Sequence, residues 1–260
     1  MSTEKIAYCF FGIPKIFEKV VGPSISKYLL LEDRQKYHIF VHTYSIDRVT
    51  NPRNGEKEDK IDHNEIFSLN PVAYLVDDRD EVDREQVDLF KKCKTRGDPW
   101  NNKYISLQNH LRQLHSINRV YDLAVKYGKD NNINYTKFVF CRLDVQYLRD
   151  CQNIITGPLD TRQIILPNWL YNYSGRPVIR GNQTNDRFGI CDGESAAIYA
   201  NRILKIGDFF DANSKNLLHS ETYMKWTLDR YKVNMVYKPI FFNRVRANGK
   251  VKEDCRNLPK

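Results

Sequence analysis

Asp144 is the residue whose type and position in this chain best suit chemistry. It follows residues 138–141, an apolar run typical of a buried strand. Ligands bind beyond the carboxyl ends of strands in an open parallel sheet, so a carboxylate there is well placed. A carboxylate binds Mn²⁺ or Mg²⁺, which in turn binds phosphate oxygens. We therefore predict that Asp144 is a metal ligand; the alternative is a residue that only caps the strand end or pairs with Arg142.

Other polar residues also stand where apolar runs of the first half end. They are Gly12, His42, Thr43, Asp77 and Asp78. If the strands are parallel, these ends meet at one edge of the sheet and converge on the same crevice as Asp144. Metal ligation by His42 is not expected, because no second histidine stands at a ligand spacing on the same element.

The elements that must position these residues can be predicted from the hydrophobic pattern. Continuous apolar runs indicate strands at residues 6–11, 38–43, 72–76, 137–141, 164–167, 187–191 and 233–237. Helical patterns lie at residues 80–92, 104–127, 193–209 and 220–231. This alternation predicts an α/β fold, a mostly parallel central sheet with helices on both faces. We predict one domain, residues 1–260.

Four local predictions come from turn residues and polar segments. Gly12 and Pro14 indicate a tight turn directly into a first helix, and Gly128 indicates the end of the long helix. Residues 46–62 are polar and charged, which indicates a mobile loop. Residues 172–185 are expected to form another loop.

Composition limits the classes of partner. The chain has 41 Lys and Arg against 32 Asp and Glu, a formal charge of +9, which favours an anionic partner. The basic residues are dispersed, unlike a nucleic-acid-binding arm. The six cysteines form no metal-ligand pattern, and neither a signal peptide nor a membrane span is recognisable. We therefore expect a reduced, cytoplasmic protein without a membrane span.

A family resemblance rests on the order of several short motifs. They read CFFGIP (9–14), IFVHTY (39–44), FVFCRLD (138–144), NDRFG (185–189), HSETY (219–223) and RVRANG (244–249). In this order, with a long helix before the third, the chain resembles viral and bacterial cytosolic glycosyltransferases. The resemblance spans nearly the whole chain and implies a single GT-A-type nucleotide-sugar transferase domain, working in a bacterial or a host cytosol.

The resemblance implies a metal site at Asp144 and also exposes a departure. Similar enzymes hold Mn²⁺ or Mg²⁺ with an Asp-x-Asp motif, but Arg142 occupies the first position here. Either Asp144 alone contacts the ion, or Arg142 itself neutralises the donor diphosphate. Arg244 and Arg246 match the segment that closes over the diphosphate in similar transferases; the alternative is a pair of solvated surface arginines.

The general base has two candidates. Glu221 opens a predicted helix where similar inverting transferases carry a base that takes the acceptor hydroxyl proton. As an alternative, a carboxylate at that position only complements the helix dipole. Asp192, directly after the strand that ends at Cys191, is the competing base.

The remaining candidates are implied contacts to the donor. The predicted donor- or nucleotide-binding residues are Gly12, His42, Thr43, Ser106, Arg112, Arg142, Asp186, Arg244 and Arg246. Gly12, His42 and Thr43 are chosen for their place at strand ends, and similar enzymes use the region of Ser106 and Arg112 for the nucleotide. Asp186 and its neighbour Arg187 are equally consistent with an exposed ion pair, and Ser106 and Arg112 with a solvated helix face.

The expected function is transfer of a sugar from a nucleotide diphosphate-sugar to a hydroxyl of a glycan or glycoprotein acceptor, with inversion assisted by a carboxylate base. Nucleic acid is not expected as a partner. Two alternatives remain open. A sugar-phosphate nucleotidyltransferase shares the βαβ organisation, although Gly12 and Lys15 supply little of its phosphate loop. A basic nucleic-acid-binding protein fits the charge of +9.

Overall fold

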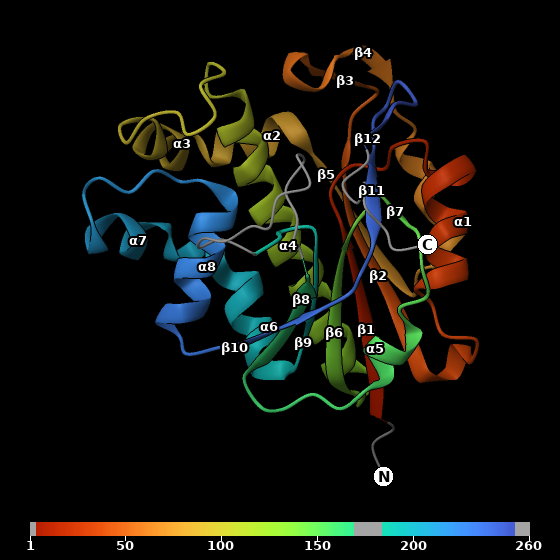
Figure 1. Ribbon diagram of the computed structural model, residues 1–260. Coiled ribbons are helices and arrows are strands. Elements are labelled where there is room, and N and C mark those ends of the chain that lie inside the picture. The colour runs from red at the N-terminus through yellow and green to blue at the C-terminus, as the bar shows by residue number, and fades with distance from the viewer. Residues whose placement is uncertain (1–3, 169–183, 253–260) are drawn as a thin grey trace.

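The computed structural model of the chain describes residues 4–168 and 184–252. The fold is α/β, as predicted, and is built on a seven-stranded sheet in the order β10-β8-β9-β6-β1-β2-β5 (Figure 1). Its strands are β1 (Glu4–Phe11), β2 (Tyr37–Ser45), β5 (Ala73–Asp78), β6 (Asn134–Arg142), β8 (Gln163–Pro167), β9 (Phe188–Cys191) and β10 (Asn234–Lys238). Each matches a predicted apolar run, and most of the predicted loop 172–185 lies outside the described residues.

One strand makes the sheet mixed. The pairs of β1 with β2 and β6, of β2 with β5 and of β8 with β10 are parallel, whereas β9 is antiparallel to both of its neighbours. Cys141 in β6 pairs with Phe188, and Phe138 pairs with Cys191. The start of β9 therefore lies at the carboxyl edge of the sheet, and its end lies at the opposite edge.

Helices cover both faces, as predicted. Along β1 the side chains of Tyr8 and Phe10 belong to one hydrophobic core, and those of Ala7, Cys9 and Phe11 to the other, because side chains alternate along a strand. The first core is covered by α1 (Gly22–Tyr28), and the second by α4 (Ile105–Asp130), α6 (Gly193–Ala200) and α8 (Ser220–Arg230) (Figure 1).

The first helix does not begin at Pro14, contrary to the sequence prediction. After Gly12, whose φ is +96°, the chain forms a π-helix, η1 (Phe17–Val21), and α1 starts only at Gly22, with a proline in its first turn. The carboxylate of Glu65 accepts hydrogen bonds from the backbone N–H groups of Phe17, at 2.6 Å, and Glu18, at 3.1 Å. A residue far along the chain thus satisfies the N-terminal donors of this segment.

Three helix boundaries also differ from the predictions. The long helix α4 passes Gly128 and ends at Asp130; a Cβ at Gly128 would lie 2.9 Å from the ring of Tyr135, so this glycine permits close packing instead of ending the helix. The predicted helices 80–92 and 193–209 are interrupted. They are replaced by α2 (Arg79–Glu85) with α3 (Val87–Lys94), and by α6 with η5 (Asn201–Lys205) and α7 (Ile206–Ala212).

The segment 46–62 was predicted to be a mobile loop, but it forms a hairpin with a buried residue. It forms β3 (Arg48–Asn51) and β4 (Glu56–Lys60), and the Glu56 side chain is fully buried. The charged composition was misleading because the partners of Glu56 lie elsewhere in the chain. A three-stranded antiparallel sheet, β7 (Val145–Tyr147), β11 (Phe242–Val245) and β12 (Val251–Lys252), lies beside it. The short helices are η2 (Arg34–Lys36), η3 (Pro52–Asn54), η4 (His63–Leu69) and α5 (Gln152–Thr156).

Two expectations about the environment can be compared with the structure. The five cysteines within the described residues are free and buried: Cys9, Cys93, Cys141, Cys151 and Cys191. Among the helices of residues 4–168 and 184–252, none combines the length and the apolar character needed to cross a membrane.

Candidate functional site

The candidate site lies at the carboxyl edge of the sheet, where strand order reverses. From β1 the chain continues to β2 on one side and later returns as β6 on the other. The Leu143 N–H donates to the Phe11 carbonyl at 3.0 Å, so the segments that follow β1 and β6 stay together. Gly12 and Asp144 therefore flank the switch point, the usual position of a ligand crevice in such sheets.

Asp144 is buried there with one oxygen unsatisfied. Arg142 Nη2 donates to Asp144 Oδ2 at 2.5 Å, whereas Oδ1 is buried without a hydrogen-bond partner. Burial raises the pKa of the Asp144 carboxyl, but the charges of Arg142, Lys15 and Arg246 outweigh it and hold the pKa below its ordinary value. Asp144 is thus an ionised carboxylate surrounded by cations, and an orphaned buried oxygen is a position where a ligand fits.

The hairpin supplies a buried ion pair next to this group. Lys15 Nζ lies 2.8 Å from Glu56 Oε1, and both side chains are buried. The same oxygen accepts the backbone N–H of Ala247 at 2.9 Å. Glu56 therefore links the turn after β1 to the segment after β11, two regions about 230 residues apart in sequence.

Arg246 is the buried cation that follows β11. The backbone N–H of Val245 donates to the Asp144 carbonyl at 2.9 Å, which brings this segment against the end of β6. Burial, reinforced by the charges of Arg244 and Arg142, lowers the pKa of Arg246, although Asp144 acts in the opposite direction. A guanidinium that is destabilised in this way gains from an added anion.

The start of β9 adds a second carboxylate to the same edge. Asp186 is buried; its Oδ2 accepts from Gln113 Nε2 at 2.9 Å, and its Oδ1 lies 3.7 Å from Arg187 Nη1. Burial raises its pKa, but the charges of Arg187, Arg142 and His110 outweigh that effect and lower it. The predicted alternative of an exposed ion pair is therefore wrong for Asp186.

Glu221 lies in the first turn of α8 and is tied to this edge through Arg187. Its Oε1 lies 3.7 Å from Arg187 Nη2, and its Oε2 accepts from Ser220 Oγ at 2.6 Å and lies 3.3 Å from His219 Nδ1. The Thr184 hydroxyl donates to the Glu221 carbonyl at 3.0 Å. These contacts hold the Glu221 carboxylate in position. The side chain is 22% exposed, so the carboxylate remains accessible.

Asp192, the competing base, lies at the opposite edge of the sheet. Because β9 is antiparallel, the residue after its last strand position faces away from Asp144. Asp192 caps α6: its carboxylate accepts from the backbone N–H groups of Ser195, at 3.1 Å, and Glu194, at 3.2 Å. This geometry gives Asp192 a structural role and does not bring it to the other candidates.

We expect Asp192→Ala to lower the free energy of unfolding by about 0.5–2 kcal/mol, because α6 loses its N-cap. Asp192→Asn retains a side-chain oxygen and should stay near the wild-type stability. Urea unfolding of the two variants measures the difference. Equal loss in both variants would show that the charge of Asp192, and not its cap, is required.

A second cluster lies beside the turn after β1. The Gly12 N–H donates to Ser116 Oγ at 2.9 Å, and the same oxygen lies 2.7 Å from His42 Nδ1. The other ring nitrogen of His42 lies 3.0 Å from Asp77 Oδ2, which also accepts from Arg119 Nε at 3.0 Å. The predicted convergence of strand-end residues thus holds for the first three parallel strands.

His115 of α4 completes this cluster. Its Nε2 lies 3.8 Å from Asp77 Oδ2, and its Nδ1 lies 3.0 Å from the hydroxyl of Tyr44. Burial lowers the pKa of His42, and burial together with repulsion from the protonated form of His42 lowers that of His115 to about 4, so both rings are neutral at pH 7. The hydrogen bond from His42 holds the pKa of Asp77 well below its usual range.

Two implied donor contacts are tied to other groups. Arg112 forms a bidentate pair with Asp83, at 2.9 and 2.5 Å. Ser106 Oγ accepts from Asn102 Nδ2 at 2.7 Å, in the first turn of α4. Ten residues of helix separate Ser106 from Ser116, about 15 Å, so Ser106 is not brought to the switch point. Thr43 lies on β2 with its hydroxyl oxygen buried and without a hydrogen-bond partner.

Several residues of the site could not be recognised in the sequence. His115 and Ser116 lie on α4, where their only signal is polarity beside a buried stripe; Ser116 is fully buried. Glu56 was hidden in a charged run, and Gln113 in a helical pattern. Only Lys15, three residues after Gly12, stood at a position that pointed to the site.

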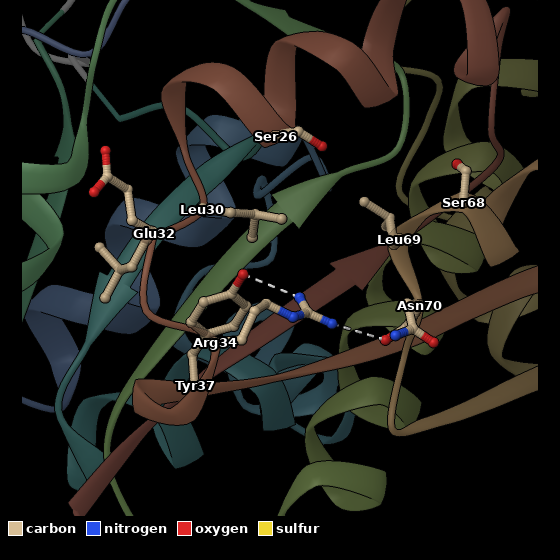
Figure 2. A pocket seen from close by; sticks show the side chains of 9 residues that line it. Ser26, Leu30, Glu32, Arg34, Tyr37, Ser68, Leu69 and Asn70 are labelled. Atoms are coloured by element: carbon tan, nitrogen blue, oxygen red, sulfur yellow. Dashed lines mark hydrogen bonds between the residues drawn. The ribbon is translucent and has the colours of Figure 1, made fainter.

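A cavity of about 290 Å³ lies elsewhere, at the amino edge of the sheet (Figure 2). Tyr37, the first residue of β2, and Asn70, which precedes β5, contribute to its lining. Arg34 crosses it and donates to the Tyr37 hydroxyl, at 3.0 Å, and to the Asn70 carbonyl, at 3.2 Å. Its lining holds one carboxylate, Glu32, and one cation, Arg34, and not the buried carboxylates and clustered cations of the carboxyl edge, which remains the candidate site.

Neither a protein-family model nor a curated protein sequence matches this chain.

Proposed function

We propose that this chain is a GT-A-type glycosyltransferase that moves a sugar from a nucleotide diphosphate-sugar to a hydroxyl of a glycan acceptor. One observation carries the proposal. A buried carboxylate, Asp144, has an orphaned oxygen and is surrounded by Lys15, Arg142 and Arg246 at the switch point of the sheet. A diphosphate together with a divalent cation matches this combination of charges.

The cations bind the donor diphosphate in this proposal. Arg142 and Arg246 offer planar guanidinium donors, which suit phosphate oxygens, and Lys15 adds a charge that its partner Glu56 holds in place. As the sugar leaves, negative charge builds up on the diphosphate, and fixed cations stabilise it most at that stage.

Asp144 Oδ1 is the atom that would hold Mn²⁺ or Mg²⁺. One protein carboxylate oxygen suits an ion that is otherwise bound by donor phosphates and water. When bound, the ion would neutralise phosphate charge as a Lewis acid. Because three cations surround Asp144, we expect the ion to enter with the donor and not before it.

Glu221 is the proposed base. Its accessible carboxylate would take the proton of the acceptor hydroxyl as that oxygen forms a bond to the anomeric carbon. The bond from this carbon to the diphosphate breaks, and the electron pair leaves with the diphosphate. Arg187, which contacts both Asp186 and Glu221, would keep the base next to Asp186, a predicted donor-binding residue.

Thermal shift with a panel of nucleotide diphosphate-sugars tests the proposal. A ligand at 100 times its dissociation constant adds about 2.7 kcal/mol of stability, so the matching donor should raise the melting temperature by several degrees. Mn²⁺ should increase this shift and give none by itself. A shift with oligonucleotides alone would favour the nucleic-acid-binding alternative, and pyrophosphate release from a sugar phosphate and a nucleoside triphosphate would favour the nucleotidyltransferase.

A further inference from the structure

Apart from Asp144 and the cations around it, one cluster has the residue types of a transition-metal site. One ligand atom each from His42, Asp77 and His115 lies within 4.8 Å of the other two. The three residues come from β2, β5 and α4, so the site is formed only by the folded chain. Two imidazoles and one carboxylate are the ligand set of many three-ligand zinc sites.

The hydrogen bonds of Tyr44 determine the tautomer of His115. The Tyr44 hydroxyl gives its single proton to the Arg112 carbonyl at 2.6 Å, so its 3.0 Å contact with His115 Nδ1 requires the proton on that nitrogen. A neutral His115 then directs the lone pair of Nε2 toward Asp77 Oδ2, 3.8 Å away. A cation placed between these two acceptors can bind both of them.

His42 can adopt the same form. If its Nδ1 carries the proton, Ser116 Oγ accepts from it and from the Gly12 N–H, and donates to the His42 carbonyl at 3.3 Å. The one donor and the two acceptor positions of the Ser116 hydroxyl are then all used. His42 Nε2, which in the other tautomer donates to Asp77 Oδ2 at 3.0 Å, is then left with a lone pair that can bind an ion. Partners that hold the far ring nitrogen are typical of metal-binding histidines.

The distances from Asp77 to the two histidines are close to those of tetrahedral coordination. Bonds of about 2.0–2.1 Å at tetrahedral angles place ligand atoms about 3.3 Å apart. Asp77 Oδ2 lies 3.0 Å from His42 Nε2 and 3.8 Å from His115 Nε2, both close to this spacing, and the three ligand atoms all lie within 4.8 Å of one another. We propose that His42, Asp77 and His115 form a second metal site, for a Zn²⁺-class ion, with one position left for water or a ligand oxygen.

Arg119 limits the affinity of this site. Its guanidinium donates to both carboxylate oxygens of Asp77, at 3.0 and 3.3 Å, and so places a positive charge next to the ion. This contact orients the carboxylate but repels a cation. Removing the charge should therefore strengthen Zn²⁺ binding, the opposite of what removal of a ligand does.

Titration calorimetry of the chelator-treated full chain with Zn²⁺ tests the site. We expect one ion per wild-type chain, at least tenfold weaker binding for His115→Gln, about 10- to 100-fold weaker binding for Tyr44→Phe, and stronger binding for Arg119→Gln. His63→Gln, a histidine on η4 outside the cluster, is the matched control. Asp144→Asn should also bind Zn²⁺ normally, which separates this site from the proposed donor site.

Spectroscopy of the Co²⁺-loaded protein identifies the ligands. A nitrogen and oxygen set gives visible d–d bands without a thiolate charge-transfer band. Absence of Zn²⁺ binding by the wild type, unchanged binding by a folded His115→Gln, or a thiolate band that marks a cysteine site would each overturn the proposal. Because His115 keeps part of its side chain exposed, circular dichroism should show a folded variant; if it does not, Tyr44→Phe decides.

Discussion

Glu221→Gln lowers the turnover of donor sugar by about 100- to 10,000-fold, the range expected when a general base is removed. The substitution keeps the size of the side chain and its contact with Ser220, but an amide cannot accept the acceptor proton. Binding of the donor should remain near wild type, because the diphosphate is bound by other residues. Steady-state turnover and the thermal shift with donor are the two measurements.

The control for this variant is Glu194→Gln. Glu194 also lies in the first turn of a helix and also pairs with an arginine, Arg162, at 2.7 Å, but it stands at the opposite edge of the sheet. It should leave turnover unchanged. Full activity of Glu221→Gln would remove Glu221 as the base and would point to transfer with retention, which needs no such base.

Asp144→Asn is expected to lower turnover by about 100- to 1,000-fold, comparable to the loss of one strong electrostatic contact in other enzymes. The substitution removes the ionised oxygen that would hold the cation and leaves Arg142, Lys15 and Arg246 with an excess of positive charge. Stimulation of turnover by Mn²⁺ should disappear. The diphosphate itself should still bind, since the cations remain.

Asp229→Asn is the matched control, because Asp229 forms a 2.6 Å ion pair with Lys225 on the exposed face of α8. It should retain turnover and Mn²⁺ stimulation. Buried charges are sensitive to the loss of a partner, so the unfolding of Asp144→Asn must be measured in parallel. A folded Asp144→Asn with wild-type turnover that still responds to Mn²⁺ would contradict the assignment of the ion to Asp144.

The strands could be predicted because they are local patterns. Residues 6–11 and 137–141 are continuous apolar runs, and a buried parallel strand needs no more than this. The positions of Gly12, His42, Asp77 and Asp144 at one edge also followed, because carboxyl ends of parallel strands lie together. The first helix was less predictable, since its start depends on Glu65, a residue distant in sequence.

The direction of a strand within the sheet could not be predicted from its apolar pattern. An apolar run looks the same for a parallel and an antiparallel strand. The direction of β9, however, determines at which edge of the sheet two acidic candidates lie. Asp186, before the strand, lies with Arg142 and Arg187, whereas Asp192, after it, caps α6 at the other edge.

The α/β class, seven of the strands and the place of Asp144 at a strand end follow from the sequence alone, because the apolar run of a buried strand is a local pattern. Which charged residues lie together depends on the tertiary structure. Glu56 is buried because Lys15 and the Ala247 N–H satisfy it, and His115 faces Asp77 because α4 packs across β2 and β5. Such contacts join residues far apart in the chain, and no local pattern encodes them.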